Sequence, residues 1–361
     1  MKKQVLTMKQ TEIEEKYMAR CIQLARGGVG HTSPNPMVGA VVVHAGRIIG
    51  EGYHRKCGEA HAEVNAIASV REQDRSLLKD STIYVSLEPC SHYGKTPPCA
   101  ELIVKTGIPR VVVGCLDPFP QVSGRGVRML REAGVEVITG VMEAECKALN
   151  RAFMTMQTAH RPYVILKWAQ SADGFLDRVR TSAEEPPVVL SSAETLRRVH
   201  RLRTEVRAIM VGTRTALLDN PSLTVRHWEG PSPLRIALDR SLKIPATHHL
   251  LDGTVPTLIF TEKAVESRAN VSYVQVDFNR PLAAQMMAVL AERKIDSLLV
   301  EGGTRLLQTF LAEGLWDEAR VETAPVSLGE GVPAPRLEEA VLREAITTRE
   351  GHVIEAFNHL K

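Results

Sequence analysis

Segments typical of strands alternate with segments typical of helices along the first half of the chain, and this alternation limits the folds available to it. Apolar runs predict strands over 37–54, 81–88, 110–117 and 135–140, with the first range forming two strands around Ala45 and Gly46. Apolar residues at helical spacing predict helices over 12–28, 61–72, 99–107 and 124–134, and a last helix from Met142 to about Thr158. Strands and helices in this order predict a three-layer α/β domain.

A second series of the same kind begins at Pro162, after a short linker. Further strands are predicted over 163–174, 207–212, 234–239, 257–260 and 297–303, and the clearest further helix over 283–294. The chain has 361 residues, which is too many for one typical domain. We therefore expect two α/β domains, residues 11–158 and 162–361, the second with a mostly parallel sheet.

The amino-acid composition argues against nucleic acid and membranes as binding partners. The net charge is +3 with neutral histidines, which argues against a dedicated nucleic-acid-binding protein. The N-terminal segment has no apolar stretch typical of a secretion signal, and no apolar run approaches the roughly 18 residues that span a bilayer. We expect a cytoplasmic homo-oligomer that acts on a small molecule and binds neither nucleic acid nor a membrane.

The six cysteines are too few for a disulfide scaffold in a chain of this length. Cys90 and Cys99 bracket eight residues that include a histidine, a lysine and two prolines. His61 and Glu63 open a predicted helix, and Cys90 follows a proline at the end of a predicted strand. Closely spaced cysteines with a histidine nearby indicate a metal site more often than a disulfide in a reducing compartment.

One histidine and two cysteines supply three zinc ligands and leave a fourth position for water, as in catalytic zinc sites. Zinc lowers the pKa of bound water from about 15.7 towards about 7, which makes hydroxide available at neutral pH. Glu63 does not bind the metal in this interpretation and carries the proton to a leaving amine. The pattern H-x-E followed by P-C is the signature of zinc deaminases that act on nucleobases, although two residues usually separate the cysteines there.

Two other interpretations stay open from the residues alone. His61 could cap a helix while Cys90 and Cys99 lie in the core, or the group could hold a structural zinc ion. No fourth ligand for a structural site is evident, because Cys57 lies in a turn-like segment.

Several motifs resemble the bifunctional deaminase/reductase family of riboflavin biosynthesis. The segments 33–43, 50–67 and 88–99 resemble its deaminase half, including the long cysteine spacing, and the segments 166–174, 211–226 and 300–311 resemble its reductase half. The resemblance implies a cytidine-deaminase-like three-layer domain followed by a dihydrofolate-reductase-like α/β domain. It implies zinc-dependent deamination of a phosphoribosylamino-diaminopyrimidine, followed by NADPH-dependent reduction of the ribosyl group to ribityl.

The resemblance also assigns the deaminase site. It implies the zinc ligands His61, Cys90 and Cys99, the catalytic residue Glu63, and the substrate-binding residues Asn35, His54, His92 and Lys95. An asparagine amide can pair with a pyrimidine edge, and a lysine suits a phosphate. Simpler roles are also open, since Asn35 could hold a turn and both His54 and Lys95 could be solvated.

For the reductase, the resemblance implies two groups of residues. The substrate-binding residues are Lys167, Arg203, Leu223, Arg226 and Glu301. The cofactor-binding residues are Ala169, Thr215, Asp219, Gly302, Gly303 and Thr304. Two glycines before a helix allow a close approach of the backbone to a phosphate, although a plain turn would explain them too.

The sequence departs from the family before the helix that begins near Ser191. Many members carry a Ser-x-Trp-Ile-Thr-like stretch there, whereas this chain reads EEPPVVLSS after a slightly longer segment. Pro187 takes the place of a substrate-binding serine, and Val189 takes the place of a tryptophan beside NADPH. One alternative is therefore a deaminase whose second domain lacks reductase activity. A nucleic-acid deaminase would need a basic, aromatic-lined surface, whereas aromatic residues make up only 4% of this chain, and a non-enzymatic zinc module is a third class.

Overall fold

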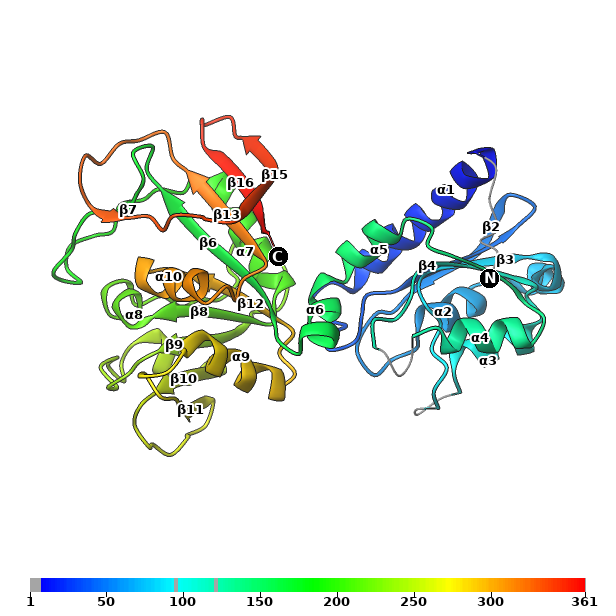
Figure 1. The fold of residues 1–361 in the computed structure, drawn as a ribbon, viewed down its shortest axis with the longest axis horizontal. Coiled ribbons are helices and arrows are strands. Elements are labelled where there is room, and N and C mark those ends of the chain that lie inside the picture. Colours follow the sequence, from blue (N-terminus) through cyan, green and yellow to red (C-terminus); the bar gives the residue numbers. More distant parts are fainter. Residues whose placement is uncertain (1–7, 94–96, 120–122, 361) are drawn as a thin grey trace. The chain divides into compact units, whose positions relative to one another are not determined.

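The computed structural model describes residues 8–93, 97–119 and 123–360, which divide into two compact units (Figure 1). The first unit ends at Ala159 and the second begins at His160. Each unit has its own sheet and its own hydrophobic core. Among the described residues, no helix combines the length and the apolar character needed to cross a membrane.

The N-terminal unit is built on a five-stranded sheet with the order β2-β1-β3-β4-β5. Its strands are β1 (Gly39–His44), β2 (Arg47–Tyr53), β3 (Thr82–Leu87), β4 (Arg110–Cys115) and β5 (Glu136–Thr139). β1 runs antiparallel to β2 and β3, while β3, β4 and β5 are parallel to one another. All five strands lie in the ranges predicted from the apolar runs.

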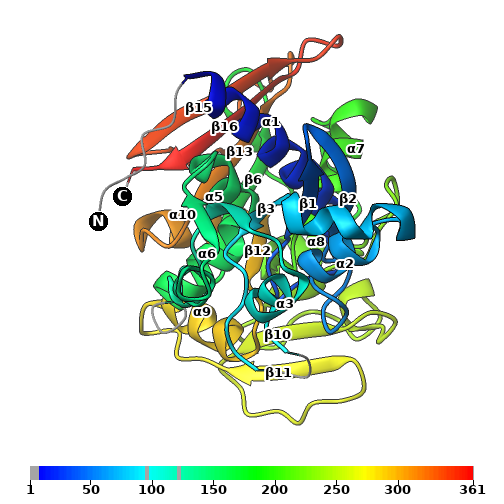
Figure 2. The same cartoon turned by 90° about the vertical axis from the view of Figure 1, so that its right-hand side faces the viewer.

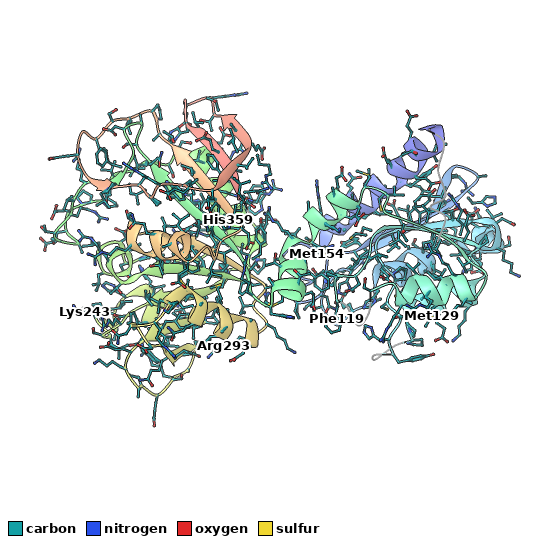
Figure 3. The ribbon with its side chains drawn as sticks, viewed as in Figure 1. Phe119, Met129, Met154, Lys243, Arg293 and His359 are labelled. Carbon is teal, nitrogen blue, oxygen red and sulfur yellow. The ribbon has the colours of Figure 1, made fainter. Side chains whose placement is uncertain are left out.

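Helices cover both faces of this sheet. They are α1 (Met8–Ala25), α2 (Ala62–Ala68), α3 (Cys99–Thr106), α4 (Arg125–Glu132), α5 (Glu143–Leu149) and α6 (Arg151–Ala159), with 3-10 turns η1 (Arg26–Gly28) and η2 (Glu72–Asp80). α1 and α5 lie on one face, and α2, α3 and α4 on the other (Figure 1). Met129, labelled on α4 in Figure 3, packs against the core of the second face. The predicted three-layer domain is confirmed.

The single helix expected from Met142 to Thr158 is wrong, because the chain forms α5 and α6 with a break at Asn150. The side chain of Asn150 is buried and pairs with the backbone of Met37 in both directions. The Met37 N–H donates to Asn150 Oδ1 at 2.8 Å, and Asn150 Nδ2 donates to the Met37 carbonyl at 2.9 Å. This contact joins the break to the segment that precedes β1.

The C-terminal unit contains a nine-stranded sheet with the order β11-β10-β9-β8-β12-β6-β13-β16-β15. Its strands are β6 (Tyr163–Gln170), β8 (Ala208–Gly212), β9 (Leu234–Leu238), β10 (Thr257–Thr261), β11 (Val271–Gln275), β12 (Ser297–Glu301), β13 (Glu318–Thr323), β15 (Ala340–Thr347) and β16 (Val353–His359). β16 pairs antiparallel with both β13 and β15, and all other neighbouring strands of the sheet pair parallel. The sheet is therefore mostly parallel, as expected. Figure 2 shows β15 and β16 side by side at the sheet edge.

The helices of this unit are α7 (Ala193–Glu205), α8 (Thr213–Asp219), α9 (Leu282–Glu292) and α10 (Thr304–Ala312), with a 3-10 turn η3 (His249–Leu251). β7 (Phe175–Asp177) and β14 (Val332–Pro333) form a separate two-stranded pair. α8 follows β8 directly and α10 follows β12, so both helices start at the carboxyl ends of central parallel strands. Ligands bind at that edge in open α/β sheets.

Candidate functional site

Three predicted zinc ligands come together in the N-terminal unit. His61 is the N-cap of α2, Cys99 is the first residue of α3, and Cys90 follows the end of β3. His61 Nδ1 and the two sulfur atoms all lie within 4.8 Å of one another. Cys57, by contrast, is exposed and lies outside this group.

The spacing of the three donor atoms fits a tetrahedral zinc ion. Zn–S bonds of about 2.3 Å and Zn–N bonds of about 2.0 Å place sulfur and nitrogen about 3.5 Å apart in a tetrahedron. His61 Nδ1 lies 3.6 Å from Cys90 Sγ and 3.4 Å from Cys99 Sγ. A three-ligand set of this kind leaves one coordination position open, as catalytic zinc sites do.

The surroundings of Cys90 favour the thiolate form that binds metal. The neighbouring Cys99 thiol and the His61 ring hydrogen-bond to its sulfur, and they lower the pKa of the Cys90 thiol below its ordinary value. The backbone N–H of Cys99, at the start of α3, also donates to Cys90 Sγ at 3.2 Å. Donors aimed at a sulfur stabilise its negative charge.

Glu63 lies in the first turn of α2, beside the ligands and almost fully buried. Burial raises the pKa of its carboxyl to about 7, with a further contribution from the negative charge of Cys90. A carboxyl with a pKa near neutrality can both take and give a proton at the working pH. The side chain also hydrogen-bonds Cys99, which places it next to the metal position.

Asn35 and His54 form a pair. Asn35 Nδ2 lies 3.3 Å from His54 Nε2, and His54 Nδ1 lies 3.1 Å from the carbonyl oxygen of Ala60. The carbonyl can only accept, so His54 carries its proton on Nδ1 and accepts from Asn35 with Nε2. Its ring is buried and packs edge-on against the His61 ring at 5.4 Å. His54 therefore orients the Asn35 amide instead of being solvated.

The segment between the two cysteines is only partly described. His92 is exposed. Lys95 lies outside the described residues. The structure does not bring His92 into the group formed by His61, Cys90 and Cys99.

Glu88 is a residue of this site that the sequence analysis missed. Its buried carboxylate accepts the backbone N–H groups of Asp117 at 3.2 Å, Gly124 at 2.9 Å and Val127 at 3.2 Å. It thereby joins the Cys90 segment to the start of α4. Gly126 is required there, because a Cβ atom would lie 2.0 Å from the carbonyl oxygen of Pro89. The E-P-C sequence was the available signal.

A cavity of about 360 Å³ lies in the C-terminal unit, and nine predicted reductase residues line it. They are Lys167, Ala169, Arg203, Thr215, Asp219, Leu223, Glu301, Gly302 and Gly303. Pro187 also lines it, whereas Val189 is 84% exposed. Arg226 and Thr304 are not among the lining residues, and the Thr304 hydroxyl donates to the Pro333 carbonyl at 2.7 Å.

The two glycines form a backbone cradle at the end of β12. Gly302 and Gly303 have positive φ angles of 87° and 79°, which residues other than glycine rarely adopt. A Cβ atom on Gly302 would lie 3.0 Å from the side chain of Thr215. The glycines therefore keep open the space between β12 and α8, directly before the N-terminus of α10. Such a backbone suits the phosphates of a dinucleotide.

Arg203 and Glu301 form an ion pair at this cavity, and one polar atom of each side chain has no hydrogen-bond partner among the described residues. Arg203 Nη2 donates to Glu301 Oε2 at 2.8 Å and Nη1 donates to the Thr224 carbonyl at 3.1 Å. Arg203 Nε and Glu301 Oε1 are buried and have no hydrogen-bond partner among the described residues. Buried polar atoms are normally paired, so these two are available to a bound substrate.

His200 holds the backbone segment that carries Arg226 in place. The sequence analysis did not identify His200 as a residue of the site. Its fully buried ring accepts the backbone N–H of Arg226 with Nδ1 at 2.9 Å. Burial lowers the pKa of His200 to about 4, and the nearby charges of Arg203, His227 and Arg226 act in the same direction. Protonating Nδ1 would break the contact, so only the neutral ring fits this place.

We expect acid to destabilise the C-terminal unit through His200. The folded pKa of about 4 lies below the ordinary 6.5, so the unfolded chain binds more protons between these values. Stability therefore falls as the pH drops through this window, by about 2 kcal/mol from pH 7 to pH 4.5. All three tryptophans belong to this unit, so tryptophan fluorescence during urea unfolding measures it selectively.

The matched variants are His200→Gln and His227→Gln. His200→Gln removes the titrating group and should remove this part of the pH dependence, whereas His227→Gln removes only a lesser charge effect on His200 and should keep most of it, since burial is the main cause of the shift. A His200→Gln protein that loses stability in acid as steeply as the wild type would contradict the assignment.

Two families match the chain in the order of its two units. Residues 11–115 match the cytidine and deoxycytidylate deaminase zinc-binding region, and residues 162–350 match the RibD C-terminal domain. The riboflavin biosynthesis protein RibD of Aquifex aeolicus is 42% identical over 350 residues, covering 95% of each chain. RibD of Escherichia coli K12 is 37% identical over 335 residues, covering 88% of this chain and 89% of its own.

Solved structures agree. A diaminohydroxyphosphoribosylaminopyrimidine deaminase/5-amino-6-(5-phosphoribosylamino)uracil reductase from Thermotoga maritima is 35% identical, with a TM-score of 0.88 over 97% of this chain and 99% of its own. RibD of Acinetobacter baumannii is 31% identical, with a TM-score of 0.85 over 96% and 99% of the two chains. This chain therefore belongs to the RibD family of riboflavin biosynthesis proteins and is an enzyme with a zinc-binding deaminase domain and a reductase domain.

Proposed function

We propose that the chain catalyses two consecutive reactions on one nucleotide. Residues 11–158 deaminate 2,5-diamino-6-(5-phosphoribosylamino)pyrimidin-4-one to 5-amino-6-(5-phosphoribosylamino)uracil. Residues 162–361 then reduce the ribosyl group to ribityl with NADPH. The observation that carries the proposal is the group of His61, Cys90 and Cys99 at tetrahedral spacing with buried Glu63 beside it. The name of the Thermotoga maritima relative gives the same two activities.

In the deaminase, His61, Cys90 and Cys99 would hold zinc, which when bound activates water as a nucleophile. Glu63 would take one proton from that water and deliver it to the ring nitrogen, and would then carry the second water proton to the amine, which leaves as ammonia, so the carboxylate returns to its starting form. The proton stays next to the reacting carbon, because Glu63 is buried against the ligands.

Substrate positioning in the deaminase falls to Asn35, held by His54. Asn35 Nδ2 lies 3.3 Å from His54 Nε2, and we assign the Oδ1 atom of the same amide as the acceptor for the pyrimidine. We also assign substrate contacts to His92 and Lys95, two residues in the long segment between the cysteines. A lysine there suits the phosphate of the substrate.

In the reductase, we assign the cradle at Gly302, Gly303 and Thr304 to the cofactor, together with Ala169, Thr215 and Asp219. NADPH, when bound, supplies the hydride for C1 of the ribose. Lys167, Leu223 and the Arg203–Glu301 pair line the same cavity and hold that carbon near the cofactor. Arg226 is exposed at the edge of this region and suits the substrate phosphate as a fork of donors.

A deaminase without reductase activity is not favoured. Pro187 lines the cavity in place of the expected serine, but the nine predicted residues around it still meet there. Backbone groups of the 187–189 segment can replace side-chain contacts, since a main-chain carbonyl or N–H binds as well as a hydroxyl.

One experiment tests both activities. The purified protein is incubated with the diaminopyrimidine nucleotide with and without NADPH, and the products are identified by mass. We expect the aminouracil nucleotide without NADPH and its ribityl form with NADPH. Deamination without NADPH oxidation would support the deaminase-only alternative, and no deamination would refute the proposal.

We further propose that the enzyme works in the cytoplasm as a homo-oligomer on small molecules and not on nucleic acid. Reducing conditions there keep the thiols of Cys90 and Cys99 available for zinc. β15 is one of the two edge strands of its sheet and exposes Val341 and Leu342 by 47% and 50%, and an exposed edge strand can pair with a second copy of the chain. Analytical ultracentrifugation of the purified protein measures its oligomeric state.

A further inference from the structure

One wall of the reductase cavity is the segment 178–188 between β7 and α7, where the sequence departs from the family pattern. Arg178, Arg180, Pro187 and Val188 line the cavity from this wall. The segment has its own internal contacts. The Glu185 carboxylate accepts from the backbone N–H of Thr181 at 3.0 Å, from the Thr181 hydroxyl at 2.9 Å and from the N–H of Ser182 at 3.0 Å.

Arg180 joins this wall to the rest of the site. The side chain is only 7% exposed, and its guanidinium contacts two carboxylates. Nε donates to Asp177 Oδ2 at 2.7 Å, and Nη2 donates to Asp219 Oδ1. Asp177 Oδ1 in turn accepts the N–H of Val188 at 3.0 Å. One guanidinium therefore connects β7, the wall and the end of α8.

Arg180 also balances two of the three carboxylates that line the cavity. Three carboxylates line the cavity: Glu301, which pairs with Arg203, and Asp177 and Asp219, which pair with Arg180. Three further cations, Lys167, Arg178 and Arg214, line it, and none of them forms an ion pair with a carboxylate of the described residues. Without Arg180, Asp177 and Asp219 would lose their ion-pair partner, and their negative charges would lie close to an anionic ligand in a confined space.

We propose that Arg180 is a positioning residue of the reductase: it neutralises Asp219 and holds the 178–188 wall so that an anionic dinucleotide can bind. This rests on the proposed use of NADPH by the C-terminal unit. Arg180 acts through Asp219 and the wall, while the expected contact with the cofactor belongs to Asp219 itself. The side chain thus compensates for the altered residues at Pro187 and Val189.

The test compares Arg180→Met with Arg180→Lys in the full-length enzyme. NADPH affinity is measured by titration, and KM and kcat of the reductase are measured with the aminouracil nucleotide. Arg180→Met should raise the KM for NADPH at least about tenfold, equal to about 1.4 kcal/mol, with a much smaller change in kcat. Arg180→Lys keeps the charge but not the fork of donors that reaches both carboxylates, so its KM for NADPH should lie between those of wild type and Arg180→Met.

A second comparison uses Asp219→Asn, alone and combined with Arg180→Met. If Arg180 acts largely through Asp219, Arg180→Met/Asp219→Asn should lose less NADPH affinity than the sum of the two single losses, because the Asp219 charge is already gone and only the contacts of Arg180 with Asp177 and the wall remain to be lost. Additive losses would contradict the proposal, as would an Arg180→Met protein with wild-type KM. Arg180→Lys binding as weakly as Arg180→Met would also contradict it.

Two controls separate the possible failures. Tryptophan fluorescence reports whether the C-terminal unit is folded, and if Arg180→Met unfolds, the Arg180→Lys result decides. Wild-type enzyme that neither binds nor oxidises NADPH would refute the proposed function instead, before any variant is compared.

Discussion

Replacing Glu63 with Gln is expected to lower deaminase turnover by about 10²–10⁴-fold, the usual contribution of general acid–base catalysis. Gln keeps the size and the hydrogen-bonding capacity of the side chain but cannot take a proton from water. The substrate should still bind, so KM should change much less than kcat. Ammonia release from the diaminopyrimidine nucleotide measures the rate, and metal analysis measures the zinc content.

The matched control is Glu72→Gln, an exposed carboxylate of the same unit at the start of η2. We expect this variant to retain full deaminase activity. Glu63→Gln should also keep its reductase activity on supplied aminouracil nucleotide, because that cavity is lined by residues of the C-terminal unit. If Glu63→Gln deaminates at the wild-type rate, another group moves the proton and the assignment is wrong.

The sequence was sufficient for the features that depend on local pattern. The strands of the first sheet follow from apolar runs, and the zinc group follows from residue types whose spacing is limited by metal chemistry. The helix at the end of the first unit was wrong because its break depends on a contact between Asn150 and Met37, 113 residues apart. No local signal carries such a contact.

The same reasoning explains which site residues were missed. Arg180 reads as an ordinary loop charge, since one of its two carboxylate partners lies 39 residues away on α8. His200 reads as one polar residue on an arginine-rich helix, and its role becomes visible only when the backbone of Arg226 lies against it. These residues position others, and a positioning role is defined by tertiary contacts that a motif does not record.

Loss of a zinc ligand is expected to abolish deamination altogether. Without the metal, water keeps a pKa of about 15.7 in place of about 7, so the supply of hydroxide at neutral pH collapses and turnover should fall by more than about 10⁴-fold. Cys99→Ala removes a ligand at the start of α3 and should reduce zinc content far below one ion per chain. Cys57→Ala removes an exposed thiol outside the group and should keep both zinc and activity.

Reductase activity serves as the control that distinguishes a catalytic effect of zinc loss from a general structural effect. The reductase cavity is lined by residues of the C-terminal unit, so Cys99→Ala and chelator-treated wild type should both still reduce supplied aminouracil nucleotide with NADPH. Returning zinc should restore deamination to the chelated wild type but not to Cys99→Ala, because only the first retains all three donors at tetrahedral spacing. Deamination by zinc-free protein would show that the cysteines and His61 serve packing, the alternative that their sequence pattern left open.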